Sequence, residues 1–498
     1  MSLADYMHRK PLAEIVRGAR GHKLVPSLGA FSITALGIGC IIGAGIFVLT
    51  GTAAAQFAGP GVMLSFVLAG IACSFVGLCY AELAALIPVS GSTYTYTYVT
   101  LGELVAWIIG WDLILEYAMG AATVSVGWSG YVVSLLKNFG IAFPPAFAAA
   151  PGTVADKLAD GTVVHGIVNL PAAFIVAVLT YLLVIGTSES ARLNNVMVAV
   201  KLAVVLAFIL IGSAYVLPAN WHPLIPENTG QFGQFGWSGI LRGAAVVFFA
   251  FIGFDAVSTA AQEARNPQRD MPIGILGSLA ICTLLYIAVA AVLTGIVPYQ
   301  DLNVADPIAR AVDVIGLTWF SVLIKIGAIA GLTTVILVLL YAQSRIFFTI
   351  AHDGLLPPIF TEIHPVRRTP WKSQIVIGTV VAIIAALTPI GILGEMVSIG
   401  TLFAFVLVCG AVLYLRKSDA TAARPFRAPG VPVVPILGIL FCLLLMAGLP
   451  LDTWLRLLVW LAIGLAVYFL YGHKHSVLMR RRSAAVGQEP SDAAGPVG

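Results

Sequence analysis

One apolar run holds more glycine than an ordinary membrane helix tolerates: Gly37-Ile38-Gly39-Cys40-Ile41-Ile42-Gly43-Ala44-Gly45-Ile46-Phe47. Glycine inside a helix costs about 1 kcal/mol relative to alanine, and it lets bare backbone approach a neighbour or a ligand. A bilayer offers no partner to a free N–H or C=O group, so a helix that opens here opens onto protein, water or a bound molecule. The run therefore predicts a helix that is interrupted beside a cavity.

The polarity of such an interruption suits an α-amino acid. Free amides at the start of the outer half attract an anion such as a carboxylate. Free carbonyls at the end of the inner half accept hydrogen bonds from an ammonium group. The run also fits a second interpretation, because Gly39 and Gly43 have the GxxxG spacing of a helix packing face. The motif by itself leaves both interpretations open.

The composition is that of a polytopic membrane protein. Of the 498 residues, 59% are hydrophobic and 10% are charged, whereas a soluble domain has about 25% charged residues. A net charge of +4, with no basic stripe that interleaves with aromatic residues, excludes nucleic acid as a partner. The six cysteines lie in or beside apolar runs and the eight histidines in loops or tails, without ligand spacing, so neither a metal site nor a cofactor is predicted.

Twelve apolar segments reach the length of about 20 residues that a spanning helix needs. If both termini are cytoplasmic, most of the 27 Lys and Arg residues lie inside and the external loops hold only Lys137, Lys157 and Arg310, which is the bias of the positive-inside rule. We therefore expect an all-α polytopic protein of the cell (inner) membrane with 12 transmembrane helices. The segments cover roughly residues 30–52, 61–87, 104–135, 166–187, 193–217, 238–260, 272–297, 318–350, 373–389, 393–415, 432–449 and 453–471.

The segments also indicate an internal duplication. Gly43 and Gly253 lie 210 residues apart, and the second and seventh segments begin 211 residues apart. The sixth segment carries its own interruption, Phe249-Ala250-Phe251-Ile252-Gly253-Phe254-Asp255. Two interrupted helices at matching places in two halves point to a binding site at the membrane midplane. Because each half has an odd number of spans, the second is expected to be inverted; the alternative is a coincidence of spacing.

This duplication divides the chain into five parts. Residues 1–29 are expected to form a cytoplasmic N-terminal segment, 30–217 the first inverted repeat and 238–415 the second. Residues 432–471 supply two further spans. Residues 472–498 are expected to form a disordered cytoplasmic tail, because the end of the chain is small and polar.

Three ionisable residues lie at bilayer depth, where a charge costs at least a few kcal/mol and asks for a partner. They are Lys201 in the fifth segment, Asp255 beside the second interruption, and Glu116 in the third segment, one turn beyond Asp112. Movement of Lys201 relative to a carboxylate would shift the balance of charge and capture or release H⁺. The alternative is a static ion pair that locks the helices together.

Two features near the second and third segments are interpreted as interfacial. Glu82 and Glu103 border the connection between these segments. Tyr94, Tyr96 and Tyr98 alternate with threonine, a period of two that predicts an extended or interfacial stretch in an aromatic belt.

Taken together, these motifs resemble the amino acid–polyamine–organocation superfamily, and within it the bacterial branch of the cationic amino acid transporters. The resemblance extends over all twelve segments. It rests on residues 39–47, on 80–84 continued through 88–92, on 248–255, on 263–272, and on 344–345 with 352–357.

The resemblance implies the LeuT fold, which is a five-plus-five inverted repeat with broken helices 1 and 6 and two peripheral helices. It implies that span 1 backbone around Gly43, Ala44 and Gly45 holds the substrate carboxylate. Ala44 stands where some relatives have a hydroxyl residue, so only backbone amides serve there. The amino group would meet carbonyls of the two breaks, with Gly253 as the glycine of the second; these carbonyls belong to Ile41, Phe249, Ala250 and Ile252.

The resemblance also bears on coupling. It implies that Lys201 occupies the place where sodium-driven relatives hold an ion, so that H⁺ is the coupling ion. It further implies that Asp255 and Glu116 match acidic positions tied to proton coupling.

We therefore expect a proton-coupled amino acid symporter that works by alternating access. Small neutral L-amino acids such as alanine are favoured, because Glu116 is the only acidic group that could face a basic substrate side chain. The alternatives are a carrier of arginine or lysine and an exchanger without net proton flow. A channel would need a charged or carbonyl filter and an enzyme a nucleophile or metal cluster; neither pattern is present. The sequence is compatible with an accessory small membrane helix as a partner but does not predict one.

Overall fold

Helices make up most of the structure, as the apolar segments predict. The computed structural model describes residues 8–10, 28–87, 93–157, 162–186, 191–255, 257–258, 263–418 and 424–486. The residues 88–92 that contribute to the family resemblance lie outside this range.

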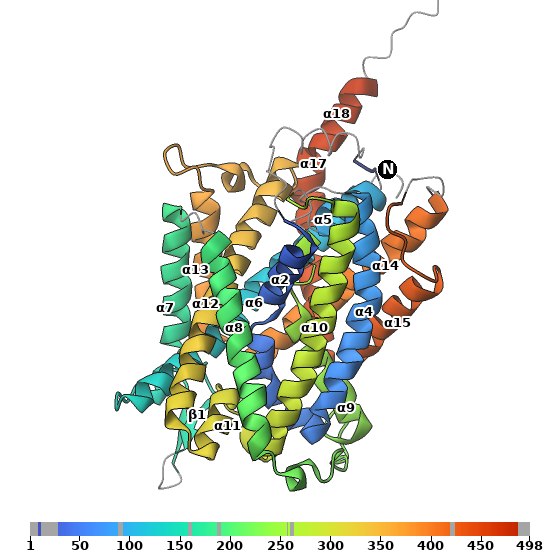
Figure 1. The fold of residues 1–498 in the computed structure, drawn as a ribbon. Helices are drawn as coiled ribbons and strands as arrows, with labels where there is room; N and C mark the ends of the chain where they lie inside the picture. The colour runs from blue at the N-terminus through green and yellow to red at the C-terminus, as the bar shows by residue number, and fades with distance from the viewer. Residues whose placement is uncertain are drawn as a thin grey trace, which may run out of the picture.

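The longer elements stand side by side as a bundle (Figure 1). In chain order, the α-helices are α2 (Ala30–Ile41), α3 (Thr50–Ala53), α4 (Val62–Leu86), α5 (Thr93–Thr100), α6 (Glu103–Asn138), α7 (Leu170–Ile185), α8 (Ala191–Gly212), α9 (Gly236–Val247), α10 (Pro267–Ile296), α11 (Pro307–Ile315), α12 (Thr318–His352), α13 (Trp371–Leu387), α14 (Ile390–Ser418), α15 (Val433–Ala447), α16 (Leu451–Val467), α17 (His473–His475) and α18 (Val477–Val486). Short π- or 3₁₀-helical pieces include η2 (Gly45–Leu49), η3 (Ala54–Ala58), η4 (Gly59–Gly61), η5 (Pro145–Phe147), η6 (Ser213–Tyr215), η7 (Pro218–Trp221), η8 (Phe248–Phe251), η10 (Tyr299–Leu302), η11 (Pro358–Thr361) and η12 (Tyr468–Gly472).

The chain is a predominantly helical polytopic membrane protein. Within the described ranges, seven helical stretches are long and apolar enough to cross a membrane, and five shorter apolar helices accompany them. Each of the twelve segments expected from the sequence contains helix.

Helices α6 and α10 organise the core. Helix α6 packs along α12 and α14, while α10 packs along α4 and α2. Small residues let these helices approach closely. A Cβ on Gly110 of α6 would lie 2.8 Å from Ile350 Cδ1 of α12, and one on Gly77 of α4 would lie 2.6 Å from Leu279 Cδ1 of α10.

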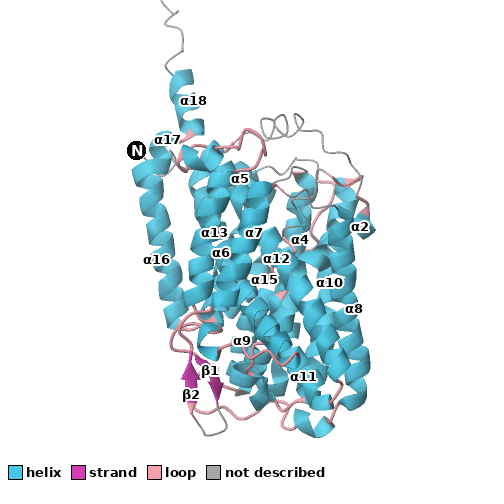
Figure 2. Cartoon of the chain, turned by 90° about the vertical axis from the view of Figure 1, so that its left-hand side faces the viewer, coloured by secondary structure: helices cyan, strands magenta, loops and turns pink. Residues whose placement is uncertain are grey.

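The two ends of the bundle carry different structures. Residues 8–10, α5 and α18 lie at one end (Figures 1 and 2). A two-stranded antiparallel hairpin, β1 (Val154–Lys157) paired with β2 (Val163–His165), lies at the other end together with α11. The hairpin is a departure from the all-α prediction, and it lies between the third and fourth apolar segments of the sequence.

Two further expectations from the sequence are wrong. The stretch with alternating tyrosines is the helix α5, and all three tyrosine side chains are buried. Hydrogen bonds from Tyr94 to Asp353 and from Tyr98 to Glu103 hold it against the bundle. The tail expected to be disordered is helical over α17 and α18, and Ser476 anchors it by donating to Glu103. Residues 487–498 lie outside the described range.

Candidate functional site

The first break lies inside the glycine-rich run. Helix α2 ends at Ile41, Ile42 is extended (φ −72°, ψ 104°), and helix resumes at Gly45. The backbone N–H groups of Gly43, Ala44 and Gly45 donate to no other backbone group in the part of the chain that the structure describes. These three amides stand at the start of a helix, where the orphan N–H groups and the helix dipole favour an anion.

The second break follows η8. Ile252 is extended (φ −60°, ψ 136°), and Gly253 has φ +112°, a conformation that side-chain-bearing residues rarely adopt. The Phe249 carbonyl accepts from the Ile252 amide at 3.2 Å. Asp255 Oδ1 in turn accepts from the Gly253 amide at 3.2 Å, so this carboxyl holds the turn in place.

The two breaks lie against each other. Gly45 faces the backbone of Ala250, whose nitrogen would lie 2.7 Å from a Cβ at position 45. Gly253 faces Cys40, whose carbonyl oxygen would lie 2.7 Å from a Cβ at position 253. Of the positions that the sequence assigned to the substrate, the structure thus brings Gly45 against Ala250. The others lie in or beside the two breaks, namely Ile41, Gly43 and Ala44 at the first and Phe249, Ile252 and Gly253 at the second. A Cβ on Gly43 would meet Val335 of α12 and not the second break.

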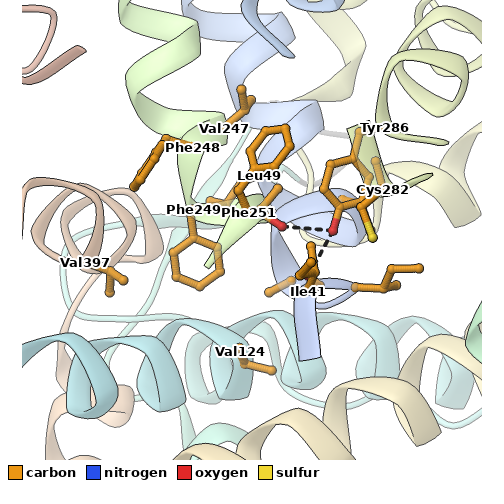
Figure 3. Packing of buried hydrophobic residues seen from close by; sticks show 14 of the residues in the cluster. Ile41, Leu49, Val124, Val247, Phe248, Phe249, Phe251, Cys282, Tyr286 and Val397 are labelled. Carbon is orange, nitrogen blue, oxygen red and sulfur yellow. Dashed lines mark hydrogen bonds between the residues drawn. The ribbon is translucent and has the colours of Figure 1, made fainter. Parts of the chain in front are cut away.

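A tyrosine that the sequence reasoning missed bridges the two breaks. The hydroxyl of Tyr286, from α10, lies 2.9 Å from the carbonyl oxygens of both Ile41 and Ala250 (Figure 3). One hydroxyl hydrogen is thus shared between two acceptors. Tyr286 is fully buried, and a buried tyrosine needs a partner for its hydroxyl. A hydroxyl within the apolar segment 272–297 could therefore have marked Tyr286 in the sequence as a residue with a buried hydrogen-bond partner.

The aromatic side chains at the second break divide into two groups. Phe251 packs edge-on against Tyr286, with ring centroids 5.5 Å apart, and Phe66 contacts both. Phe249 is directed away from this cluster, toward the side of the break where Val124 and Val397 lie (Figure 3). That side of the break is therefore walled by apolar groups from α6 and α14.

The three ionisable residues singled out by the sequence are all buried. Lys201 packs on Gly331 of α12, and its Nζ donates to the Gly39 carbonyl of α2 at 3.1 Å. Lys201 and Asp255 both act electrostatically on Cys40, which lies in the last turn of α2, just before the first break. Glu116 is set further along α6 and is within electrostatic reach of Asp255.

A further ionic cluster lies near the opposite end of the bundle from α5. It lines a cavity of about 350 Å³ formed by the end of α6, by α11 and by α12. Lys325 contacts Asn138 at 2.8 Å and Asp313 at 3.3 Å. Burial raises the pKa of Asp306, in the loop before α11, to about 6, against the opposing effects of a Ser134 hydrogen bond and of Lys325.

Known proteins resemble this chain over nearly its whole length. The profile of the Amino acid permease family matches residues 28–467. A branched-chain amino acid permease of Bacillus subtilis is 50% identical over 472 residues, which cover 94% of this chain and 98% of that protein. A methylthioribose transporter of the same organism is 47% identical, covering 96% and 100%. The chloroplastic cationic amino acid transporter 9 of Arabidopsis thaliana is 37% identical, covering 93% and 90%.

The match to the permease profile begins before the first break and ends with the last residue of α16, so it includes both helix breaks. The chain belongs to the amino acid permease family of the amino acid–polyamine–organocation superfamily, and is a membrane transporter rather than an enzyme.

Proposed function

We propose that this permease imports neutral L-amino acids together with a proton, with branched-chain amino acids as its preferred substrates. The observation that carries the proposal is the set of three bare amides at Gly43, Ala44 and Gly45, placed against a second broken helix. A free carboxylate fits the amides because they form a helix N-terminus.

The ammonium group of the substrate needs hydrogen-bond acceptors, because all of its N–H groups are donors. The oxygens of Ile41, Ala250 and Tyr286 share a single hydrogen. Each carbonyl oxygen has a second lone pair, and the two carbonyls have only the one tyrosine hydrogen between them. An ammonium group can therefore donate further hydrogen bonds to the carbonyl oxygens of Ile41 and Ala250. The amides of residues 43–45 follow the Ile41 carbonyl directly in the chain, so the two kinds of group stand at the same break.

The side-chain preference follows from the apolar wall and from the relatives. Phe249, Val124 and Val397 offer no charge to a basic substrate, which supports neutral over cationic amino acids. A relative at 50% identity is a branched-chain amino acid permease, which favours leucine, isoleucine and valine over alanine. Methylthioribose, the cargo in the name of another relative, has neither carboxylate nor ammonium group and leaves the amides unused.

The proposal includes the architecture that alternating access needs. Twelve spans in the LeuT arrangement, with residues 30–217 and 238–415 as inverted repeats and 432–471 as peripheral helices, place both breaks at the midplane. Both described ends of the chain lie at one end of the bundle, which supports an even number of crossings. The distribution of Lys and Arg then puts both termini in the cytoplasm of a cell-membrane protein.

Proton coupling is assigned to Lys201, Asp255 and Glu116. Lys201 holds the inner half of the first helix through Gly39, and Asp255 holds the turn of the second through the Gly253 amide. A proton placed on Asp255 weakens that turn, because a neutral carboxyl is a poorer acceptor than a carboxylate. Since Gly253 touches Cys40, the change reaches the first break directly.

Uptake into proteoliposomes tests this function. With an acidic exterior, leucine should accumulate above its equilibrium level, and a protonophore should abolish the accumulation. Alanine, arginine and methylthioribose serve as competitors, and arginine or methylthioribose competing better than isoleucine would contradict the assigned substrate class. Counterflow without any acid-driven accumulation would identify an exchanger.

A further inference from the structure

Asp112 of α6 is a buried carboxyl that the coupling site leaves unused. Its side chain is fully buried, and within the described ranges neither Oδ1 nor Oδ2 has a hydrogen-bond partner. A polar group buried in this way costs free energy unless its environment or its function compensates. Packing alone does not explain why a carboxyl is buried at position 112.

The groups that α14 and α12 present near this part of α6 are polar and carry no charge. Across the interface, a Cβ on Gly400 of α14 would lie 2.9 Å from Asp112 Oδ1, so the missing side chain at 400 makes room for the carboxyl. Thr401, also of α14, lies beside Glu116 with its hydroxyl within reach of that carboxyl. Gln343 of α12 donates to the Ile114 carbonyl and leaves its own Oε1 without a partner in the same part of the chain.

Among the described residues, the charged groups that act on Glu116 are the carboxyls of Asp112 and Asp255, and the cation beside α5, Lys10, is paired with Asp353. Glu116 lies one helical turn from Asp112, and Asp255 lies beyond it. The described ion pairs include neither Asp112 nor Glu116. Of the helices packed against this part of α6, α5 presents Tyr94, whose hydroxyl is engaged by Asp353, and α16 presents the uncharged Trp460. α12 and α14 present the groups named above.

The positions of Asp112 and Glu116 along α6 show which carboxyl is nearer to each end of the bundle. Asp112 is nine residues from the start of α6 and Glu116 is thirteen, which places them about 14 and 20 Å along the helix at 1.5 Å per residue. The start of α6 is the end of the bundle that carries residues 8–10 and α18. Asp112 thus lies between the coupling site and the end assigned to the cytoplasm.

We propose that Asp112 is a third proton-carrying carboxyl, after Asp255 and Glu116, on the route by which the coupled proton reaches the cytoplasm. Two carboxyls one turn apart without a cation cannot both be charged at low cost. The O–H bond of Glu116 breaks as the O–H bond of Asp112 forms, directly or through the Thr401 hydroxyl, which both donates and accepts. Asp112 then gives its proton to water at the cytoplasmic side, and is left as the carboxylate that receives the next one. The inference rests on the proposed proton coupling.

The test separates proton movement from amino acid binding. Asp112→Asn keeps the shape of the side chain and removes the proton carrier, while Asp112→Glu keeps the carrier. Leucine counterflow, which needs no net proton movement, and acid-driven accumulation are measured for each in proteoliposomes, with internal pH followed by a trapped dye. We expect Asp112→Asn to keep counterflow within about twofold and to lose at least about tenfold in accumulation and proton uptake, and Asp112→Glu to restore both.

A purely structural Asp112 gives a different pattern. Loss of counterflow and accumulation by the same factor in Asp112→Asn, or wild-type accumulation in that variant, overturns the inference. If Asp112→Asn does not fold, Gly400→Ala provides the second measurement, because its methyl group presses on Asp112 without changing any charge and should lower accumulation more than counterflow. Absence of acid-driven accumulation in the unmodified protein would instead remove the proposed coupling, and this inference with it.

Discussion

Replacing Gly45 with alanine should separate the two helix breaks. The new Cβ would lie 2.7 Å from the backbone nitrogen of Ala250, and closer still to its α-carbon. The α-carbon would be 2.2 Å away and ordinary contact begins at 3.4 Å, so the two segments must move apart by about 1.2 Å, because a backbone atom cannot rotate away. A shift of that size stretches one of the two 2.9 Å bonds that Tyr286 makes to the breaks past hydrogen-bonding length.

The free-energy cost has two parts. Overpacking in a well-packed interior costs about 1–3 kcal/mol, and the lost hydrogen bond costs about 0.5–1.5 kcal/mol. A total of about 1.5–4.5 kcal/mol lowers the population of this arrangement roughly tenfold or more, since 1.4 kcal/mol corresponds to a factor of ten. Leucine uptake at subsaturating concentration should fall by a similar factor.

Gly43→Ala is the matched control. It lies two residues away in the same run, but a Cβ there would meet only Val335, at 3.6 Å, an ordinary contact. Both variants are purified, checked for monodispersity and melting temperature, and assayed for leucine uptake in proteoliposomes. Gly43→Ala should keep most of the wild-type rate. Equal rates for the two variants would refute the contact between the breaks as the basis of transport.

Three further predictions address coupling, the tyrosine bridge and the external end. Lys201→Ala and Asp255→Asn should each abolish acid-driven leucine accumulation in proteoliposomes, and unchanged accumulation in both would remove the proton relay. Tyr286→Phe, which loses one hydroxyl, should lower stability by about 1–3 kcal/mol because two buried carbonyls lose their donor; thermal melting measures this, and an unchanged melting temperature would show that the bridge carries no stability. Because burial raises the pKa of Asp306 from 3.8 to about 6, the folded state binds more protons than the unfolded state between these values. Stability from this group is therefore full below about pH 4 and is lost as pH rises through about 6. Asp306→Asn should raise the melting temperature at pH 7.5 and leave it unchanged at pH 4, and a uniform shift at both values would contradict the assignment.

The helix breaks could be predicted because glycine acts through local geometry. The missing side chains of Gly45 and Gly253 weaken a helix whatever surrounds them, so an excess of glycine in an apolar run is readable without tertiary information. The matching spacing of the two runs then placed both breaks in one site. The positions at bilayer depth of Lys201 and Asp255 were readable for a similar reason, since charge in an apolar span stands out.

The remaining features depend on partners that are far away in sequence. Glu82 was interpreted as interfacial, but it is buried and accepts two hydrogen bonds from Arg416, which is 334 residues away. Glu103 is likewise buried, and it accepts hydrogen bonds from Tyr98 and from Tyr468. Such pairings compensate for buried charge, and no local pattern announces them. The alternation of tyrosine and threonine in α5 looked like a strand because these residues favour strands, and tertiary contacts overrode that preference.

The shared hydrogen of Tyr286 has a consequence for the alternating access that we propose. If the inner half of the first helix tilted away, the phenol would not lose its only bond, because the same hydrogen would then belong wholly to Ala250. If the other break withdrew, it would belong wholly to Ile41. Either movement would exchange a split bond for a single straight one, and α10 would serve as a pivot that stays bonded to one of the two breaks.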